Sequence, residues 1–384
     1  MTSPVIKKLR VGVIGTGLIA QVMHLHFLRE LRDRYELVAL CDISKESAQA
    51  CADEYGVEKV FTDWRELIKE PLDAVMILTS GSHAPIAVAA AEAGLHVFVE
   101  KPMCFSVDEG QSMVEAAKKA GVKLMVGYPK RYDPAFVRFS EEIGALAHPK
   151  LLRVTTCESP FHPYVSHYPL NPPGAVDDEL VKELRSDTQA RLAAAIGTDD
   201  AFYINQYHAV MLDTLVHEIN TVRGVLGEPD RLDYVELREG SLTAMLRFGE
   251  TAVAIHWIDL PGITRYLMEF AAFDDDGRVT LSFPSPFLRN APTLLAIECG
   301  DADGVDSWRR EEVTSYESGF KLELVAFYDA VVNGAKVPTD GLDGTRDIAL
   351  CQAIIRSARE GVAIEQPTKL KSLDVTSERK KETL

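Results

Sequence analysis

The first 130 residues of the chain alternate short apolar runs with longer segments of helical periodicity. Strands are expected at residues 9–15, 35–42, 72–80, 95–101 and 123–131, and helices at 18–32, 44–56, 85–94 and 106–121. The strand segments are rich in β-branched residues, as in strands buried on both faces. Strands that alternate with helices pair in parallel, so we predict an α/β domain with a doubly wound parallel sheet over residues 1–130.

The pattern changes after residue 150, where strand-like segments follow one another through short turns. They lie at residues 151–159, 231–240, 241–250, 251–260, 264–277 and 278–283. Turn signals such as Asp-Asp-Gly separate them. Helical spacing returns at residues 176–196, 211–229, 320–333 and 345–361. We therefore predict a second, α+β domain over residues 131–384, with a large mainly antiparallel sheet and an insertion at 159–207.

Composition narrows the classes of partner and compartment. The chain has 384 residues, enough for two domains, and its net charge is 41 − 58 = −17, which disfavours nucleic acid and anionic membranes as partners. Its six cysteines form no C-x-x-C pair, so a reducing compartment is expected. The N-terminal residues lead into a strand and do not resemble a signal peptide, and no apolar run reaches membrane-spanning length. These features predict a cytoplasmic protein.

The segment GTGLIA, residues 15–20, fits the pattern G-x-G-x-x-A between an expected strand and an expected helix. Gly15 and Gly17 permit a tight turn and close approach of a pyrophosphate to the helix N-terminus. Asp42 ends the second strand, where a carboxylate can accept both ribose hydroxyls and would repel a 2′-phosphate. The sequence therefore predicts a Rossmann-type site for NAD. The alternative is an ordinary strand–helix turn with a surface acid.

Two charged residues, Glu100 and Lys101, end the buried run VFVEKP and precede Pro102. In a parallel sheet this strand end lies along the edge where dinucleotides bind. The ammonium group of Lys101 can donate hydrogen bonds to a substrate hydroxyl and lower its pKa. The alternative is a salt-bridged pair at a strand end.

Residues 211–229 have helical periodicity and place Asp213 and His217 four positions apart, on one face. A histidine can take the proton of an alcohol while hydride leaves the same carbon, and a carboxylate can hold a second hydroxyl. A buried helix histidine with an intrahelical acid is the alternative.

Taken together, these motifs resemble the glucose–fructose oxidoreductase/inositol dehydrogenase/rhizopine-catabolism family, written Gfo/Idh/MocA. The shared elements, in the family's order, are the phosphate loop 15–20, Asp42, EKP at 100–102, VGYPKRYDP at 126–134, D-x-x-x-H at 213–217 and the tail pattern at 327–341. The resemblance covers nearly the whole chain. It implies an NAD(P)-dependent oxidoreductase that acts on sugars or polyols.

The resemblance also implies a role for each matching position. Lys101 would polarise the reacting hydroxyl, His217 would be the acid/base, and Asp213 would bind substrate hydroxyls. Further cofactor-binding positions are Leu18, Ile19, Ser80, His83, Glu100, Lys101 and Arg131, and further substrate-binding positions are Tyr128 and Arg131. Family resemblance and a broad sheet face that must be covered predict a homodimer or homotetramer.

The insertion contains four aromatic or imidazole side chains, at His162, Tyr164, His167 and Tyr168. One interpretation is a wall over the substrate, to which His162 and Tyr164 would contribute, because aromatic faces suit sugar rings. A metal site with Asp177 or Asp178 and a packing loop or subunit contact are the alternatives. Arg185 and Arg191, on the helix that follows, are expected to be solvated.

The function predicted from these observations is NAD-dependent oxidation of a secondary hydroxyl of a sugar, cyclic polyol or sugar derivative. The alternative is an NAD-dependent glycoside hydrolase, in which transient oxidation at C3 permits elimination, water addition and re-reduction. Accumulation of NADH distinguishes the first function, whereas release of aglycone in excess over NAD distinguishes the second. A non-enzymatic NAD-binding regulator is a third possibility, disfavoured by the intact Lys101, Asp213 and His217.

Overall fold

The computed structural model of the chain describes residues 7–146, 149–300 and 304–370. Within these ranges the strands form two sheets, one of six strands and one of nine. Two compact units contain them. The first unit comprises the residues up to 129 together with 167–197 and 320–345, and the second comprises 130–166, 198–319 and the residues from 346 onward. The sequence predicts two continuous domains with a boundary near residue 130, and the first unit also has a boundary there. Two later segments, 167–197 and 320–345, belong to the first unit as well.

The first unit contains a parallel sheet in the order β3-β2-β1-β4-β5-β6. Its strands are β1 (Leu9–Ile14), β2 (Tyr35–Cys41), β3 (Lys59–Phe61), β4 (Ala74–Ile77), β5 (His96–Glu100) and β6 (Leu124–Gly127). Every residue of the central strand β4 and of the edge strand β6 is buried, as expected for a parallel sheet covered on both faces. The strand order is that of the Rossmann fold, so the doubly wound sheet predicted from the sequence is confirmed.

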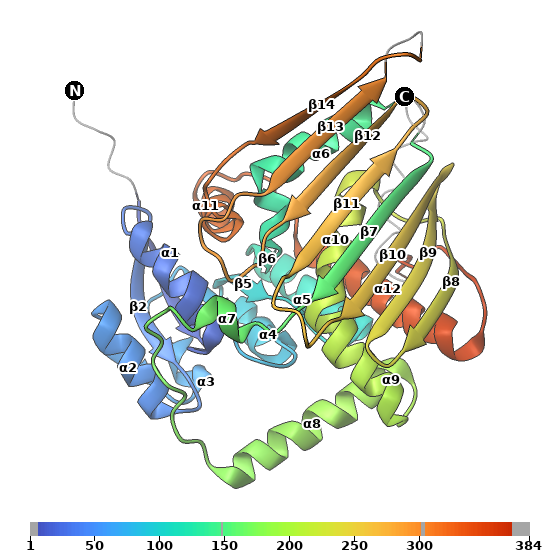
Figure 1. The fold of residues 1–384 in the computed structure, drawn as a ribbon. Coiled ribbons are helices and arrows are strands. Elements are labelled where there is room, and N and C mark those ends of the chain that lie inside the picture. The colour runs from blue at the N-terminus through green and yellow to red at the C-terminus, as the bar shows by residue number, and fades with distance from the viewer. Residues whose placement is uncertain (1–6, 147–148, 301–303, 371–384) are drawn as a thin grey trace, which may run out of the picture. The chain divides into compact units, whose positions relative to one another are not determined.

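Helices connect the parallel strands (Figure 1). They are α1 (Leu25–Glu30), α2 (Lys45–Tyr55), α3 (Trp64–Leu67), α4 (Ala84–Glu92) and α5 (Val107–Ala120), joined in this unit by α8 (Asp178–Ile196) and by α11 (Gly319–Val332) from residue 320. Ser44 and Ser106 cap α2 and α5 with their hydroxyls, and Gly56 and Gly121 end them at positive φ. The first helix differs from expectation, because it begins with a π-helical turn, η1 (Ala20–His24).

The second unit contains a mixed sheet in the order β14-β13-β12-β11-β7-β10-β9-β8-β15. Its strands are β7 (Leu151–Glu158), β8 (Arg231–Arg238), β9 (Ser241–Phe248), β10 (Thr251–Asp259), β11 (Leu267–Phe273), β12 (Gly277–Phe283), β13 (Leu294–Gly300), β14 (Ser307–Val313) and β15 (Ile364–Glu365). Only β7 and β10 pair in parallel among the described strands of this sheet, so the mainly antiparallel sheet is confirmed.

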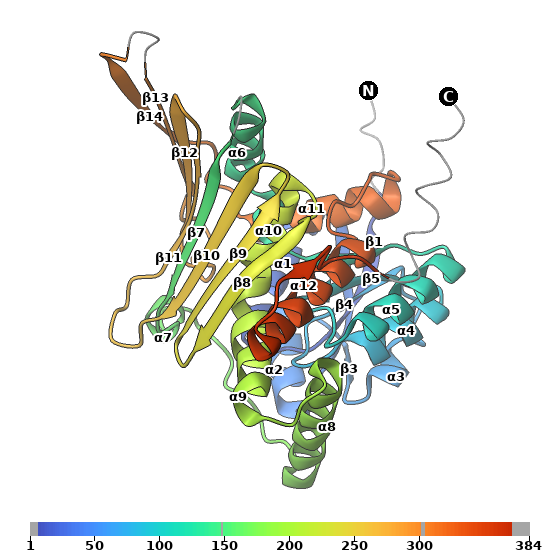
Figure 2. The same cartoon turned by 90° about the vertical axis from the view of Figure 1, so that its right-hand side faces the viewer.

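Helices of the second unit pack on one face of this sheet, as Figure 2 shows for α6 and α10. The helical elements are η2 (Pro129–Tyr132), α6 (Pro134–Ala145), α7 (His162–Val165), α9 (Ala201–Asn205), η3 (Gln206–Leu215), α10 (Val216–Leu226) and α12 (Gly341–Glu360), which belongs to this unit from residue 346. Thr156 of β7 donates a hydrogen bond of 2.5 Å to the buried carboxylate of Glu218, which fixes α10 to the sheet. In the part of the chain that the structure describes, no helix combines the length and apolar character needed to cross a membrane.

Candidate active site

The loop after β1 has the geometry that a pyrophosphate needs. Gly15 has a φ of +99°, and a Cβ there would lie 2.7 Å from the backbone of Leu78, so only glycine fits. Gly17 is exposed, and a Cβ on it would meet none of the described atoms within 4 Å. The half-buried Leu18 and Ile19 follow at the start of the helix, where N–H groups are available. These residues fit the phosphates of a dinucleotide.

Asp42 follows β2 and braces the same loop. Its Oδ2 accepts hydrogen bonds from the main-chain N–H and the hydroxyl of Thr16, at 2.8 and 3.0 Å, and its Oδ1 accepts one from the N–H of Ser44, at 2.9 Å. A carboxylate oxygen can accept more than one hydrogen bond, so this side chain keeps acceptor capacity for ribose hydroxyls. Its role in binding the ribose hydroxyls of a nucleotide remains a prediction.

Ser80 and His83 lie where the chain leaves β4. Ser80 is exposed, whereas His83 is buried and its Nε2 donates a hydrogen bond of 2.7 Å to the carbonyl oxygen of Thr79. Burial lowers the pKa of His83, and this effect outweighs the opposing effects of the Thr79 carbonyl and the charge of Glu100. The ring is therefore neutral at physiological pH. A neutral, immobile ring is suited to lining a cofactor site, which remains a prediction for both residues.

Glu100 and Lys101 emerge at the carboxyl end of β5, as the sequence predicts. Lys101 is half-buried, and its peptide bond to Pro102 is cis. Glu100 is only 5% exposed. Its Oε2 accepts the main-chain N–H of Lys101 at 3.0 Å, and its Oε1 lies 2.6 Å from Nε2 of His24. Both oxygens of Glu100 thus hold protein groups, and a direct contact between Glu100 and the cofactor remains a prediction.

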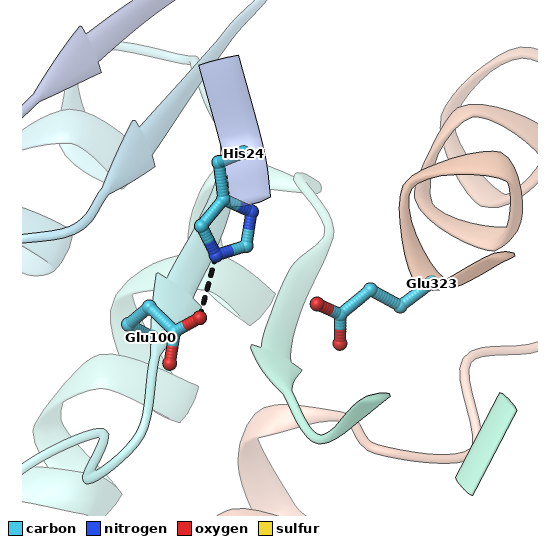
Figure 3. Close-up of side chains that lie close together, drawn as sticks. All are labelled: His24, Glu100 and Glu323. Atoms are coloured by element: carbon cyan, nitrogen blue, oxygen red, sulfur yellow. Dashed lines mark hydrogen bonds and ion pairs between the residues drawn. The ribbon is translucent and has the colours of Figure 1, made fainter. Parts of the chain in front are cut away.

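A third side chain, Glu323 of α11, directs its carboxylate toward His24 and Glu100 (Figure 3). Among the described residues, these three form the one group of histidine, cysteine and acidic side chains whose potential ligand atoms all lie within 4.8 Å of one another. All three are buried. The group contains no residue of the insertion, where Asp177 instead caps α8 by accepting hydrogen bonds from two main-chain N–H groups.

In the second unit, Asp213 and His217 lie on either side of a change in helix type. Asp213 is exposed and belongs to the π-helical segment η3, whereas His217 is half-buried in the first turn of α10. The sequence predicts one regular helix over 211–229, and this is wrong in detail, because η3 inserts wider turns before α10. The predicted chemical roles of the two side chains remain predictions.

Arg131 is bound to the helix that carries His217. Its Nη1 donates hydrogen bonds to the main-chain and side-chain oxygens of Asn220, at 3.2 and 3.3 Å. Asn220 in turn donates a hydrogen bond of 2.8 Å from Nδ2 to Asp347 of α12. Asp347 also pairs with Arg223, and both are buried. Sequence reasoning missed this network, although Arg131 itself is a predicted binding residue.

The predicted substrate-binding residues outside this network differ in exposure. Tyr128 is buried in the first unit, and His162 is exposed in the second. The hydroxyl of Tyr164 donates a hydrogen bond of 2.8 Å to the carbonyl of Thr264 and accepts one of 2.9 Å from the N–H of Tyr266. Tyr164 therefore has at least a packing role, which agrees with the packing loop given above as an alternative for this insertion.

Residues 167–177, which we call the strap, lie against the phosphate-loop region of the first unit. Gln21 and Asn171 exchange hydrogen bonds, with the N–H of Asn171 at 2.8 Å from the side-chain oxygen of Gln21. Asn171 also donates a hydrogen bond of 3.0 Å to Glu54 of α2. A Cβ on Gly174 would lie 2.1 Å from the hydroxyl oxygen of Ser44, so the strap packs closely against the N-terminal end of α2. Figure 1 shows this segment in green, passing α1 and α2 before it enters α8.

The expectation that Arg191 is solvated is wrong. Its Nε and Nη2 donate to Oε1 of Glu109, at 3.0 and 2.5 Å, and its guanidinium lies over the ring of Phe105. The other oxygen of Glu109 accepts hydrogen bonds from Ser82 and from the N–H of Phe105. Arg191 therefore anchors α8 to the first unit.

Comparison with known proteins shows that the chain is similar to NAD-binding oxidoreductases. Residues 9–128 match the model of GFO_IDH_MocA, described as "Oxidoreductase family, NAD-binding Rossmann fold". The myo-inositol 2-dehydrogenase of Thermotoga maritima is 26% identical over 368 residues, which cover 92% of this chain and 97% of that protein. The D-apiose dehydrogenase of Paraburkholderia graminis is 27% identical over 391 residues, which cover 97% and 92% of the two chains.

A solved structure has the same fold. A levoglucosan dehydrogenase in complex with NADH and L-sorbose superposes with a TM-score of 0.73 at 20% identity, over 94% of this chain and 100% of that chain.

Proposed function

We propose that the chain is a member of the Gfo/Idh/MocA family of NAD-binding oxidoreductases and that it oxidises a secondary hydroxyl of a sugar, cyclic polyol or sugar derivative with NAD as the acceptor. The observation that carries this proposal is the joint occurrence of the phosphate loop, Lys101 and His217 in a chain that matches a polyol dehydrogenase over 92% of its length. Both relatives described above act, by name, on polyhydroxylated molecules.

In this function NAD supplies the nicotinamide C4 that accepts the hydride. The ammonium group of Lys101 donates a hydrogen bond to the substrate oxygen and stabilises the alkoxide as it develops. His217 takes the hydroxyl proton through a ring nitrogen. Asp213, which is exposed, accepts hydrogen bonds from neighbouring hydroxyls. The proposal requires Lys101 and His217 to reach the same hydroxyl group.

Binding is proposed for the other predicted positions. The cofactor set is Gly15, Gly17, Leu18, Ile19, Asp42, Ser80, His83, Glu100, Lys101 and Arg131, and the substrate set is Lys101, Tyr128, Arg131, His162, Tyr164, Asp213 and His217. We also propose a cytoplasmic homodimer or homotetramer. The six cysteines of the chain all lie in described residues and are free thiols, as expected for a reducing compartment.

The test is NADH formation from NAD⁺ with myo-inositol, D-apiose and levoglucosan as probes. We expect Lys101→Ala and His217→Ala each to lower kcat by about 100-fold or more, with a much smaller change in the Kd for NAD. Lys69→Ala and His208→Ala are matched controls on exposed positions. Unchanged turnover in Lys101→Ala or His217→Ala would remove the corresponding role, and the absence of NADH with every probe would contradict the dehydrogenase.

The strap favours a second candidate function, the NAD-dependent glycoside hydrolase. Asn171 contacts Gln21, the residue after the phosphate loop, and Gly174 lies against Ser44, two residues after Asp42. A segment held so near the proposed cofactor site would slow cofactor exchange, which a redox-neutral reaction tolerates. In that reaction the C3 hydroxyl would lose its proton to a base and its carbon would lose hydride to NAD, which gives a C3 ketone. A base would then remove the C2 proton, the C1 substituent would leave and take up a proton, and water would add across C1 and C2. Return of the hydride and a proton to C3 would restore the alcohol and NAD. An aryl glycoside probe that releases aglycone in large excess over NAD, without net NADH, would establish this function over the first.

A further inference from the structure

The main-chain N–H of Lys101 is bonded to a charged side chain at the point where β5 leaves the sheet. The β5–β6 ladder ends with the pair Glu100 and Gly127. One residue later, Oε2 of Glu100 accepts the N–H of Lys101 at 3.0 Å. A buried N–H group needs an acceptor, and this one comes from the preceding side chain, which restricts the backbone torsions between the two residues. The direction in which the Lys101 side chain leaves the backbone therefore depends on where the Glu100 carboxylate is held.

His24 holds that carboxylate from the other side. Its Nε2 lies 2.6 Å from Oε1 of Glu100, and its ring is fully buried. The ring lies edge-on between Phe98 and Phe320, with centroid distances of 5.5 and 5.7 Å. These contacts prevent rotation of the imidazole. His24 is the last residue of the π-helical turn η1, and π-helical turns occur frequently at functional sites.

The Glu100 carboxylate is held as an anion. Burial raises its pKa, but the hydrogen bond and charge of His24 and the charge and N–H of Lys101 outweigh burial and lower the pKa below its ordinary value of 4.5. Hydrogen bonds to a charged acceptor are stronger and shorter than neutral ones. Glu323, which lies within 4.8 Å of the group, gives the buried pair a second carboxylate neighbour (Figure 3).

We propose that His24 and Glu100 are positioning residues, which act through each other to hold Lys101 in the orientation that its proposed role in turnover requires. The inference rests on the proposed function in one respect, which is the role of Lys101 in turnover. Neither His24 nor Glu100 needs to touch the substrate. A loss of placement of about 1 Å at a reacting group can lower turnover about 100-fold, so the effect falls on kcat and not on binding.

The test uses the NAD-loaded full chain and the probe, among myo-inositol, D-apiose and levoglucosan, that is turned over fastest. Glu100→Gln keeps the shape of the side chain and removes its charge, and His24→Leu removes the donor. We expect each to lower kcat by about 10-fold to 100-fold while KM changes less than about threefold, and the Kd for NAD of His24→Leu should change by no more than that. His24→Gln, whose amide can donate in place of Nε2, should restore most of the activity.

A double-mutant cycle separates positioning from general destabilisation. If Glu100 acts through Lys101, the pair Glu100→Gln with Lys101→Ala will be no slower than Lys101→Ala alone. Independent losses that multiply would overturn the proposal. His96→Asn is the matched control, because His96 lies at the opposite end of β5, where its Nδ1 accepts the main-chain N–H of Lys123, the residue before β6, at 3.0 Å. It should leave turnover unchanged.

A second measurement needs no substrate. Hydrogen exchange of the peptide fragment that carries Lys101 should become at least about tenfold faster in His24→Leu and Glu100→Ala, with or without NAD, and not in His96→Asn. Unchanged exchange in both variants would overturn the proposal even if Lys101 proves essential. Conversely, full turnover by Lys101→Ala would refute the proposed role of Lys101 in turnover. Faster exchange in the His24 and Glu100 variants would still establish that these residues hold the Lys101 backbone. Failure of the proposed function can therefore be distinguished from failure of the positioning proposal. Because His24→Leu leaves a buried carboxylate without its donor, the isosteric Glu100→Gln decides the kinetics if that variant does not fold.

Discussion

The two units hold their candidate residues by different physical means. In the first unit, Gly17, Asp42 and Lys101 lie directly after strands of the parallel sheet, so the sheet backbone presents them. In the second unit, Asp213 and His217 lie where η3 meets α10, and side chains from distant parts of the chain hold that helix.

This difference sets how each unit should respond to substitution. Backbone presentation depends on a few positions where no other residue fits, such as Gly15, and tolerates change elsewhere. The buried pair of Asp347 and Arg223 is sensitive to the loss of either charge, because the remaining charge stays buried, although Arg223 keeps its ion pair with Glu228 and Asp347 keeps its hydrogen bond from Asn220. The predictions below test this contrast, from the largest expected effect to the smallest.

The largest effect is expected for Asp347→Ala in the second unit. The substitution leaves Arg223, whose side chain is 1% exposed, without its buried partner, and it removes the acceptor of Asn220. We expect a loss of about 3–5 kcal/mol in the free energy of unfolding, measured by urea denaturation. Arg247→Ala, which breaks an exposed ion pair with Asp233 in the same unit, is the control and should cost less than about 1 kcal/mol. Equal effects in the two variants would refute the contrast.

Gly15→Ala tests the backbone side of the comparison. A Cβ at this position meets Leu78 at 2.7 Å while φ is +99°, so the loop must shift. We expect the Kd for NAD to rise at least about tenfold and stability to fall by about 1–3 kcal/mol. Gly94→Ala has a similar positive φ of +82° and no described atom within 4 Å of the added Cβ, so it isolates the clash. Unaltered NAD binding by Gly15→Ala would remove the loop from the cofactor site.

The acid dependence of stability should be visible in both units. Glu100 in the first unit and Glu228 in the second each have a pKa lowered below 4.5, because His24 and Arg223 respectively outweigh the effect of burial. A depressed folded pKa stabilises the protein above the ordinary value and loses that contribution as pH falls through the folded value. The free energy of unfolding, measured by urea denaturation, should therefore fall as the pH is lowered below 4.5. Glu100→Gln and Glu228→Gln should each make the dependence shallower, and identical curves for wild type and both variants would contradict the assignment.

Arg191→Ala should have the smallest effect. The pair with Glu109 anchors α8 to the first unit, but both side chains keep some solvent contact, 27% and 20%. The expected loss is about 0.2–1 kcal/mol in unfolding free energy, with turnover unchanged. Arg185→Ala on the same helix is the matched control and should have no measurable effect. A large loss of NAD affinity in Arg191→Ala would instead show that α8 controls the cofactor site.

The elements that follow from local chemistry were predictable from the sequence. The caps at Ser44 and Ser106 and the turn at Gly15 depend on neighbours within a few positions. The parallel strand order follows from alternating strand and helix segments. Since the carboxyl ends of these strands share one edge, Asp42 and Lys101 could be assigned to that edge before any coordinates were known.

The features that sequence reasoning missed depend on long-range contacts or on small changes in helix geometry. Apolar spacing does not distinguish a π-helical turn from an α-helical turn, so η1 and η3 were not expected. Strand β14, with the sequence SWRREEV, is mostly exposed and has no apolar alternation to reveal it. Asn220 and Asp347 are 127 positions apart, and nothing in either segment alone indicates that they meet.

The division of the chain between the units has a consequence for synthesis on the ribosome. The chain passes from one unit to the other after residues 129, 166, 197, 319 and 345, so the NAD-binding unit takes its last segment from near the end of the sequence. The buried hydroxyl of Tyr35 in β2 needs that segment for its hydrogen bond, because it donates to the carbonyl oxygen of Leu324 at 2.6 Å. The contact between the N-terminal sheet and α11 therefore cannot form until most of the polypeptide has left the exit tunnel.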